Sequence, residues 1–184
     1  MNIKIFVTIP ILTSGLTTQA AIYKIFPDKG QITFLAKGKP ALISIKGEGD
    51  GATAVLKEKD QILTGEISFQ LKSLKTGIEL RDDHLKNKYL EVDKYPTATL
   101  KISDLKLPAN LNDIFSFQGT LSLHGIDQPV EGIVSVTSDS KSQKLSADFK
   151  IKLSQFKIEI PSFKGITVAE EVQVKVEAAV MREE

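Results

Sequence analysis

Apolar and polar side chains alternate with a period of two over most of this chain from Tyr23 onward. In the segment 65–72, Ile67, Phe69 and Leu71 share one face of an extended backbone, and polar side chains occupy the other face. Turn-forming residues separate these short runs, which is typical of a mainly antiparallel sheet. The sequence therefore predicts strands over residues 31–38, 41–47, 52–57, 62–74, 97–105, 115–124, 128–138, 144–153 and 171–180.

The predicted sheet has one face that is apolar throughout. A flat sheet would need a second layer to cover this face, yet little of the sequence is helical. Closing the sheet on itself covers the apolar face and also removes the free strand edges. We therefore predict an all-β fold, an antiparallel eight-stranded β-barrel with one short helical connection.

The helical connection is predicted over residues 78–90. Thr76 or Gly77 can start it, and Pro96 biases the preceding residue toward an extended backbone, so the helix must end before the strand at 97. The glycine-rich segment 46–51 and the segment 137–140 carry turn chemistry. Residues 156–168 are predicted to form a second short helix or an irregular loop.

Composition narrows the functional classes. The chain has 184 residues, the length of a single domain, and a formal net charge of +1, which gives no strong field toward nucleic acid or an anionic membrane. No cysteine is present, so disulfides, a thiol nucleophile, a thiolate metal site and lipid attachment to cysteine are all excluded.

The first twenty residues have the tripartite order of a secretory signal. Lys4 supplies an early positive charge, residues 5–16 are apolar, and Thr18 and Ala20 suit the small-residue positions before a cleavage site. The apolar run is shorter than the roughly 20 residues that span a bilayer, so we expect no stable membrane insertion. We predict a signal peptide over 1–20, a mature domain over 21–184, and a periplasmic or secreted protein.

Three motifs in the middle of the chain resemble a known family. They are R-D-D-H-L at residues 81–85, the dipeptide Tyr95-Pro96, and G-T-L-S-L-H-G at 119–125 followed by Pro129. Their order is similar to that of the YceI-like family. The resemblance implies a secreted, lipocalin-like β-barrel that holds a long isoprenoid or similar amphiphile, and therefore a binding protein, not an enzyme.

The inward positions of the strands are the candidate ligand-binding residues. Barrel interiors can be filled by side chains or can enclose a ligand, and alternation cannot measure volume. The absence of tryptophan and the eight-stranded size favour a cavity, and so does the family resemblance. The residues expected to line it are Phe69, Leu100, Ile102, Phe117, Leu121, Phe149, Ile151 and Val174.

A polar cluster in the helical connection allows two interpretations. Asp83 and His84 could act as an acid–base pair, yet neither a nucleophile turn nor a phosphate loop accompanies them. We favour a structural role in which Arg81 and one aspartate lock the connection against the barrel rim. His124 is expected to stabilise its turn. The groups expected to orient a ligand head group at the rim are Arg81, Asp83, His84 and Tyr89.

The leading functional hypothesis is an exported carrier for a long-chain isoprenoid, a quinone-like lipid or a fatty amphiphile, with no cofactor and no metal. Two alternatives remain open. One is a solid-barrel, stress-related interaction protein, and the other is an enzyme that acts on an amphiphile through His84 and Asp83. The oligomeric state is left open between a monomer and a homodimer.

Overall fold

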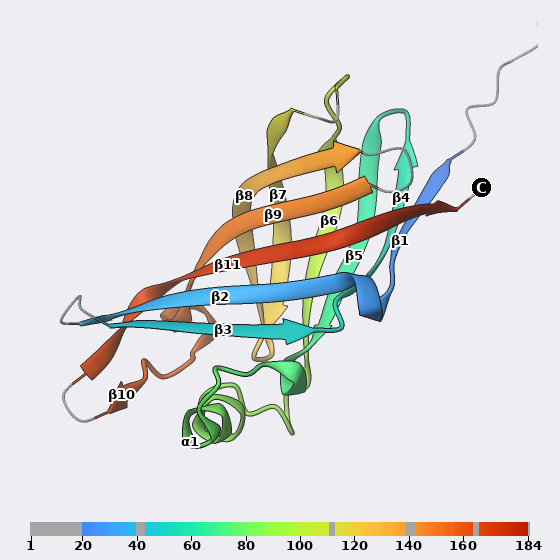
Figure 1. Cartoon of the computed structure of the whole chain (residues 1–184). Helices are drawn as coiled ribbons and strands as arrows, with labels where there is room; N and C mark the ends of the chain where they lie inside the picture. Colours follow the sequence, from blue (N-terminus) through green and yellow to red (C-terminus); the bar gives the residue numbers. More distant parts are fainter. Residues whose placement is uncertain (1–19, 40–42, 111–112, 139–142, 164–165, 184) are drawn as a thin grey trace, which may run out of the picture.

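A computed structural model describes residues 20–39, 43–110, 113–138, 143–163 and 166–183 (Figure 1). The predicted signal peptide therefore lies outside the described residues except for Ala20. The strands are β1 Ala21–Ile25, β2 Gly30–Lys39, β3 Ser44–Asp50, β4 Thr53–Lys59, β5 Ile62–Gln70, β6 Thr97–Lys106, β7 Ile114–Leu123, β8 Ile126–Ser138, β9 Gln143–Lys152, β10 Ser162–Phe163 and β11 Ile166–Glu183. The helical turns are η1 Pro27–Lys29, η2 Leu71–Ser73, α1 Glu79–Asp83, the π-helix η3 His84–Tyr89, and η4 Leu153–Phe156.

Eight strands close into a barrel in the order β1-β4-β5-β6-β7-β8-β9-β11. The closing pair is β1 with the C-terminal part of β11, where Ile22 lies opposite Glu183. This arrangement confirms the predicted antiparallel eight-stranded barrel with one short helix. The closure follows from the alternation, because all the inward faces then meet in one interior.

The long strand β11 has two successive partners on the same side. Its C-terminal part pairs with β1, and its N-terminal part pairs with β2 from Thr167 opposite Lys39 to Ala178 opposite Gly30. β3 then pairs with β2, so the β2–β3 hairpin extends the wall beyond the closed ring (Figure 1). Among the described residues, the outer edge of β3 pairs only at Glu48, which bridges to Lys75. The barrel is thus closed by hydrogen-bonded strands at the β1–β4 end. At the other end the β2–β3 hairpin continues the sheet, and β3 is bonded to the rest of the barrel on its outer side only through Glu48 among the described residues.

Several predicted elements differ from the structure. The last strand, predicted over 171–180, runs from Ile166 to Glu183, so part of the predicted loop 156–168 belongs to β10 and β11. β1 was not expected, because its five residues are too few for the alternation to stand out. β5 ends at Gln70 and gives way to η2, so the predicted strand over 62–74 is too long. The segment 46–51 does not form a turn but lies mostly in β3, where its glycines serve a packing purpose described below.

The helical connection over 79–89 matches the predicted range 78–90 to within one residue at each end. Its second half is a π-helix, which the sequence did not indicate. Leu90 and Val92 follow it and are buried, while Leu85 and Tyr89 pack against the same core. The connection therefore covers the β2–β3 end of the barrel (Figure 1). Among the described residues, no helix combines the length and the apolar character needed to cross a bilayer.

His124 fastens the turn between β7 and β8, as expected. Its Nδ1 lies 3.0 Å from the carbonyl oxygen of Phe156, its Nε2 lies 2.7 Å from Oε2 of Glu91, and its ring packs edge-on against Tyr95 with centroids 4.6 Å apart. The neighbouring Gly125 has a positive φ of 72°, a conformation that favours glycine in this turn. One histidine thus ties together the connection after η3, the β7–β8 turn and η4.

Candidate functional site

A cavity of about 430 Å³ lies inside the β2–β3 end of the barrel, between the strands and the helical connection. This volume falls within the range of about 300–1,000 Å³ typical of small-molecule pockets. Its walls are overwhelmingly apolar. The apolar lining residues that lie on strands are Ile32, Phe34, Ala36, Ile45, Phe69, Ala98, Leu121, Leu123, Phe149, Ile151, Val168, Val172 and Val174.

The barrel is hollow at one end and solid at the other. On β6, Ala98 lines the cavity, whereas Leu100 and Ile102 do not, and on β7 Leu121 lines it but Phe117 does not. The strands β5, β9 and β11 are divided in the same way into a part that lines the cavity and a part that does not. In each of them the lining part is the one toward the β2–β3 end. At the closed end a second core cluster, which includes residues of β1 and β4, fills the interior. The strands β5, β6, β7, β9 and β11 therefore each contribute to both the packed core and the cavity wall.

Five of the eight residues predicted to bind ligand line this cavity: Phe69, Leu121, Phe149, Ile151 and Val174. The other three, Leu100, Ile102 and Phe117, point inward as expected but are buried in the packed core. Alternation assigns a side of the sheet to a residue but not a height along the barrel axis. The sequence therefore could not separate these two groups.

The boundary between the two halves is an aromatic pair. The rings of Phe117 and Phe149 meet edge to face with centroids 5.9 Å apart. Gly132 lies opposite both in the sheet, and a Cβ atom there would come within 2.8 Å of the Phe117 ring. The glycine therefore allows the two rings to meet, with Phe149 lining the cavity and Phe117 in the packed core behind it.

Sequence reasoning missed the wall that β3 provides. A Cβ atom at Gly47 would lie 2.2 Å from Cε1 of Phe34, and one at Gly49 would lie 2.6 Å from Cζ of Phe69. Real Cβ contacts are never this short, so the two glycines leave room for two phenyl rings that line the cavity. The glycines suggested a turn in the sequence, but their packing role depends on residues from other strands.

The segment after β9 is a second contribution that the sequence did not assign. Ile158 and Pro161 line the cavity from the region predicted to be a helix or an irregular loop, and Leu153, predicted to end a strand, lines it from the start of η4. Leu71, the first residue of η2, and Leu74, which directly follows η2, also line the cavity. These residues carry no distinctive motif, and only the tertiary arrangement assigns them to the site.

The cavity reaches the surface beside the helical connection. Ile78 and Leu80 line it although their side chains are 53% and 59% exposed, and Ile43 lines it at 38% exposure. Large apolar side chains with this much exposure are unusual when they are grouped together. They mark the mouth, where a ligand would enter between β3 and α1.

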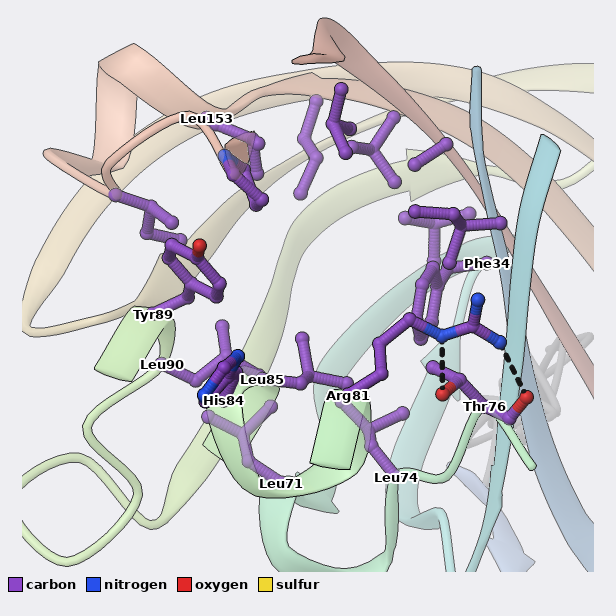
Figure 2. A pocket seen from close by; sticks show the side chains of 18 of the residues that line it. Phe34, Leu71, Leu74, Thr76, Arg81, His84, Leu85, Tyr89, Leu90 and Leu153 are labelled. Carbon is purple, nitrogen blue, oxygen red and sulfur yellow. Dashed lines mark hydrogen bonds between the residues drawn. The ribbon is translucent and has the colours of Figure 1, made fainter. Parts of the chain in front are cut away.

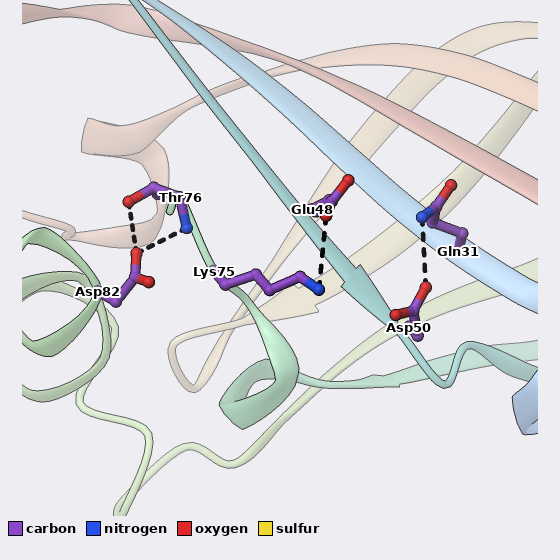
Figure 3. Close-up of polar contacts among 6 residues, drawn as sticks. All are labelled: Gln31, Glu48, Asp50, Lys75, Thr76 and Asp82. Atoms are coloured by element: carbon purple, nitrogen blue, oxygen red, sulfur yellow. Dashed lines mark hydrogen bonds and ion pairs between the residues drawn. The ribbon is translucent and has the colours of Figure 1, made fainter. Parts of the chain in front are cut away.

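Arg81 and Asp82 at the mouth both bind Thr76 (Figure 2, Figure 3). Arg81 donates from Nε to the Thr76 hydroxyl oxygen at 2.7 Å and from Nη2 to its carbonyl oxygen at 2.8 Å. Asp82 Oδ1 accepts from the Thr76 hydroxyl and from its backbone N–H, the latter at 2.6 Å. The arginine and the aspartate therefore lock the connection as expected, but through a threonine between them.

These hydrogen bonds determine the charge state of Asp82. Its partial burial would by itself raise the pKa of the carboxyl group, but the bonds from the side chain and backbone of Thr76 outweigh that effect and hold the pKa below its usual value. Lys86 and Arg81 add a favourable field in the same direction. Asp82 is thus an ionised structural group beside the cavity mouth.

Two of the three remaining predicted rim residues line the cavity, and the third lies on the surface. His84 and Tyr89 line the cavity, and Figure 2 shows them with Arg81 along the helical connection. Asp83 is exposed, is not among the lining residues and accepts a hydrogen bond from Asn87 Nδ2 at 2.6 Å. His84 and Asp83 thus do not meet in the cavity as an acid–base pair would. Among the described residues, no group of three or more His, Asp or Glu side chains could hold a metal ion.

Polar contacts outside the cavity hold β3 to its neighbours (Figure 3). The backbones of Glu48 and Lys75 exchange hydrogen bonds of 2.9 and 2.8 Å, and their side chains form an ion pair at 3.5 Å. On the other side of the hairpin, Gln31 Nε2 donates to Asp50 at 3.3 Å. The exposed ion pair adds little, so the backbone hydrogen bonds contribute more than the ion pair to holding β3 against the segment that leads to Arg81.

Comparison with known proteins agrees with this architecture. The family profile described as the YceI-like domain matches residues 23–180. A search of curated protein sequences finds no significant match.

Solved structures with the same fold come from several bacteria. BcnA of Burkholderia cenocepacia has a TM-score of 0.70 at 22% identity, with 85% of this chain and 99% of that chain covered. A polyisoprenoid binding domain from Saccharophagus degradans, implicated in plant cell wall breakdown, has a TM-score of 0.68 at 14% identity, with 88% and 98% covered. The YCEI protein of Campylobacter jejuni has a TM-score of 0.55 at 20% identity, with 75% and 86% covered.

Proposed function

The chain belongs to the YceI-like family, and we propose that it is a carrier that binds the apolar chain of an isoprenoid, a quinone-like lipid or a fatty amphiphile inside the hollow end of its barrel. The proposal rests mainly on the apolar cavity of about 430 Å³ and its exposed apolar mouth. Transfer of an apolar chain from water is worth about 25 cal/mol for each Å² buried, so such a wall binds without specific polar contacts.

Two further observations support a carrier over an enzyme. The acid–base pair that an enzyme would need is divided, with His84 in the lining and Asp83 on the surface. One protein of similar fold is described as a polyisoprenoid binding domain. A chain longer than the cavity would extend through the mouth past Ile78 and Leu80.

Filling the cavity tests this function directly. Ala98 lines the cavity, whereas its neighbour Thr99 lies on the outer face of the same strand. We expect Ala98→Phe to lower the affinity for the neutral dye Nile red at least tenfold while the protein stays folded, and Thr99→Phe to leave it unchanged. Mass spectrometry of an organic extract of the purified protein should identify the natural ligand. Wild-type protein that binds no dye and yields no lipid would refute the carrier.

We also propose that the protein is exported and acts in the periplasm or outside the cell. The support is the order of charge, apolar run and small residues in positions 1–20. N-terminal sequencing of protein from its native host should begin at Ala21, and a mature chain that begins at Met1 would contradict export by cleavage.

A further inference from the structure

The polar groups of the cavity lining are few, and none of them carries a carboxylate. Among the described residues that line it, only Thr76, Arg81, His84, Tyr89 and Ser162 carry polar side chains, and none is an aspartate or a glutamate. Arg81 is the one side chain among them with a permanent charge. The cavity therefore presents a cation to its contents without a carboxylate beside it in the wall.

Arg81 still has donors to offer. Two of the five N–H groups of a guanidinium are taken by Thr76, through Nε and Nη2, which leaves three. Among the described residues, Arg81 takes part in no ion pair. The group is therefore held in a fixed position by neutral oxygens, and its charge has no direct partner.

Asp82, the residue after Arg81, is an anion that binds the same threonine but does not line the cavity. Its Oδ1 is occupied by the N–H and the hydroxyl of Thr76, and it does not line the cavity. Thr76 thus separates the carboxylate from the guanidinium and orients the latter. An anionic oxygen from a ligand could approach Arg81 without displacing an existing salt bridge.

The next turn of the connection adds donors on the same wall. His84 lies three residues after Arg81, a spacing that puts both on one face of a helix, and Tyr89 follows at the other end of the connection (Figure 2). An imidazole N–H and a phenol O–H both donate to oxygen. Two further donors therefore lie along the connection that carries Arg81, and the exposed apolar side chains of Ile78 and Leu80 line the mouth next to it.

We infer that this site selects amphiphiles with an acidic oxygen head group, a carboxylate or a phosphate, which Arg81 binds at the mouth while the apolar chain fills the cavity. The inference rests on the proposed carrier function and adds the class of ligand. Charge-assisted hydrogen bonds to a guanidinium favour such a head over a neutral ester, and repulsion from Arg81 disfavours an ammonium.

Three probes that share one chain test the inference: dodecanoic acid, its methyl ester and dodecylamine, each titrated against protein-bound Nile red at pH 8. Wild-type protein is expected to bind the acid about tenfold more tightly than the ester, the equivalent of one charge-assisted hydrogen bond, and the amine most weakly. The advantage of the acid should shrink as salt is raised, because this part of the mouth is exposed.

Two substitutions test whether Arg81 causes the preference for the acid over the ester. Arg81→Gln should abolish the advantage of the acid over the ester, whereas Lys86→Gln, which removes a charge from the same connection outside the cavity lining, should preserve it. Equal binding of acid, ester and amine by wild-type protein would overturn the head-group inference and leave the carrier function intact. If neither the ester nor Nile red binds, the carrier function itself fails.

Discussion

Arg81 holds Thr76 by two hydrogen bonds, from Nε to the hydroxyl oxygen at 2.7 Å and from Nη2 to the carbonyl oxygen at 2.8 Å. The same hydroxyl donates to Asp82, so it accepts from a cation and donates to an anion at once. This threonine lies in the segment between η2 and α1. Its hydrogen bonds therefore fasten α1 to the segment that precedes it beside the cavity mouth.

Thr76→Val keeps the shape of the side chain but removes both side-chain bonds. We expect it to lower the free energy of unfolding by about 1–2 kcal/mol, because hydrogen bonds to charged groups are lost at a half-buried site. The urea midpoint should fall with an unchanged slope. Thr99→Val, on the outer face of β6, serves as the control, and equal midpoints for the two variants would contradict the role given to Thr76.

The lowered pKa of Asp82 predicts how this tie responds to acid. Because the folded-state pKa is below the unfolded value of about 3.9, the stabilisation is fully present above that value and is lost as the pH falls through the folded-state pKa. Wild-type protein should therefore be more stable than Asp82→Asn at pH 7, and the difference should shrink below about pH 4. Urea unfolding of both proteins across this range measures it, and a difference that stays constant down to the acid limit would contradict the prediction.

Gly47 should not tolerate a side chain. A Cβ atom would meet the Phe34 ring at 2.2 Å, so Gly47→Ala must displace a wall of the cavity, and we expect a loss of about 1–3 kcal/mol in stability. Phe34→Leu in the same protein should recover part of this loss, since the smaller side chain leaves space. Additive effects of the two changes in a double-mutant cycle would show that the contact with Phe34 is not the cause.

The division of the barrel into a solid and a hollow half can be tested by matched aspartates. Phe117→Asp places a carboxyl group in the packed core, where desolvation is costly, and the protein should fail to fold cooperatively. Ile151→Asp places the same group in the cavity wall, so Nile red binding should fall more than stability does. If both variants unfold to the same degree, the interior at Ile151 is as solid as at Phe117.

The strand pattern was enough to establish the class of fold. Alternation along β6, β7 and β9 predicted which side chains point inward, because a sheet with one apolar face has few ways to cover it other than closure. The residues that bound segment 78–90 predicted a short helical connection, and the resemblance carried by the three central motifs agrees with the family match over residues 23–180. These are local properties of the chain, or follow from a periodicity visible within one strand.

The remaining features required residues from distant segments to meet. Gly47 and Gly49 favour a turn when considered alone, but Phe34 and Phe69 from two other strands require them in β3. Leu100 and Leu121 have the same alternation signal and face each other in the sheet, yet only Leu121 borders the cavity.

The sequence by itself therefore determined the inward residues and the closed sheet, because each strand carries its own alternation of apolar and polar side chains. Only the tertiary structure decided where the interior is empty and that Thr76 is the partner of Arg81. A cavity is the space that many side chains from separate strands fail to fill, and that volume is a property of their joint packing, not of any one segment.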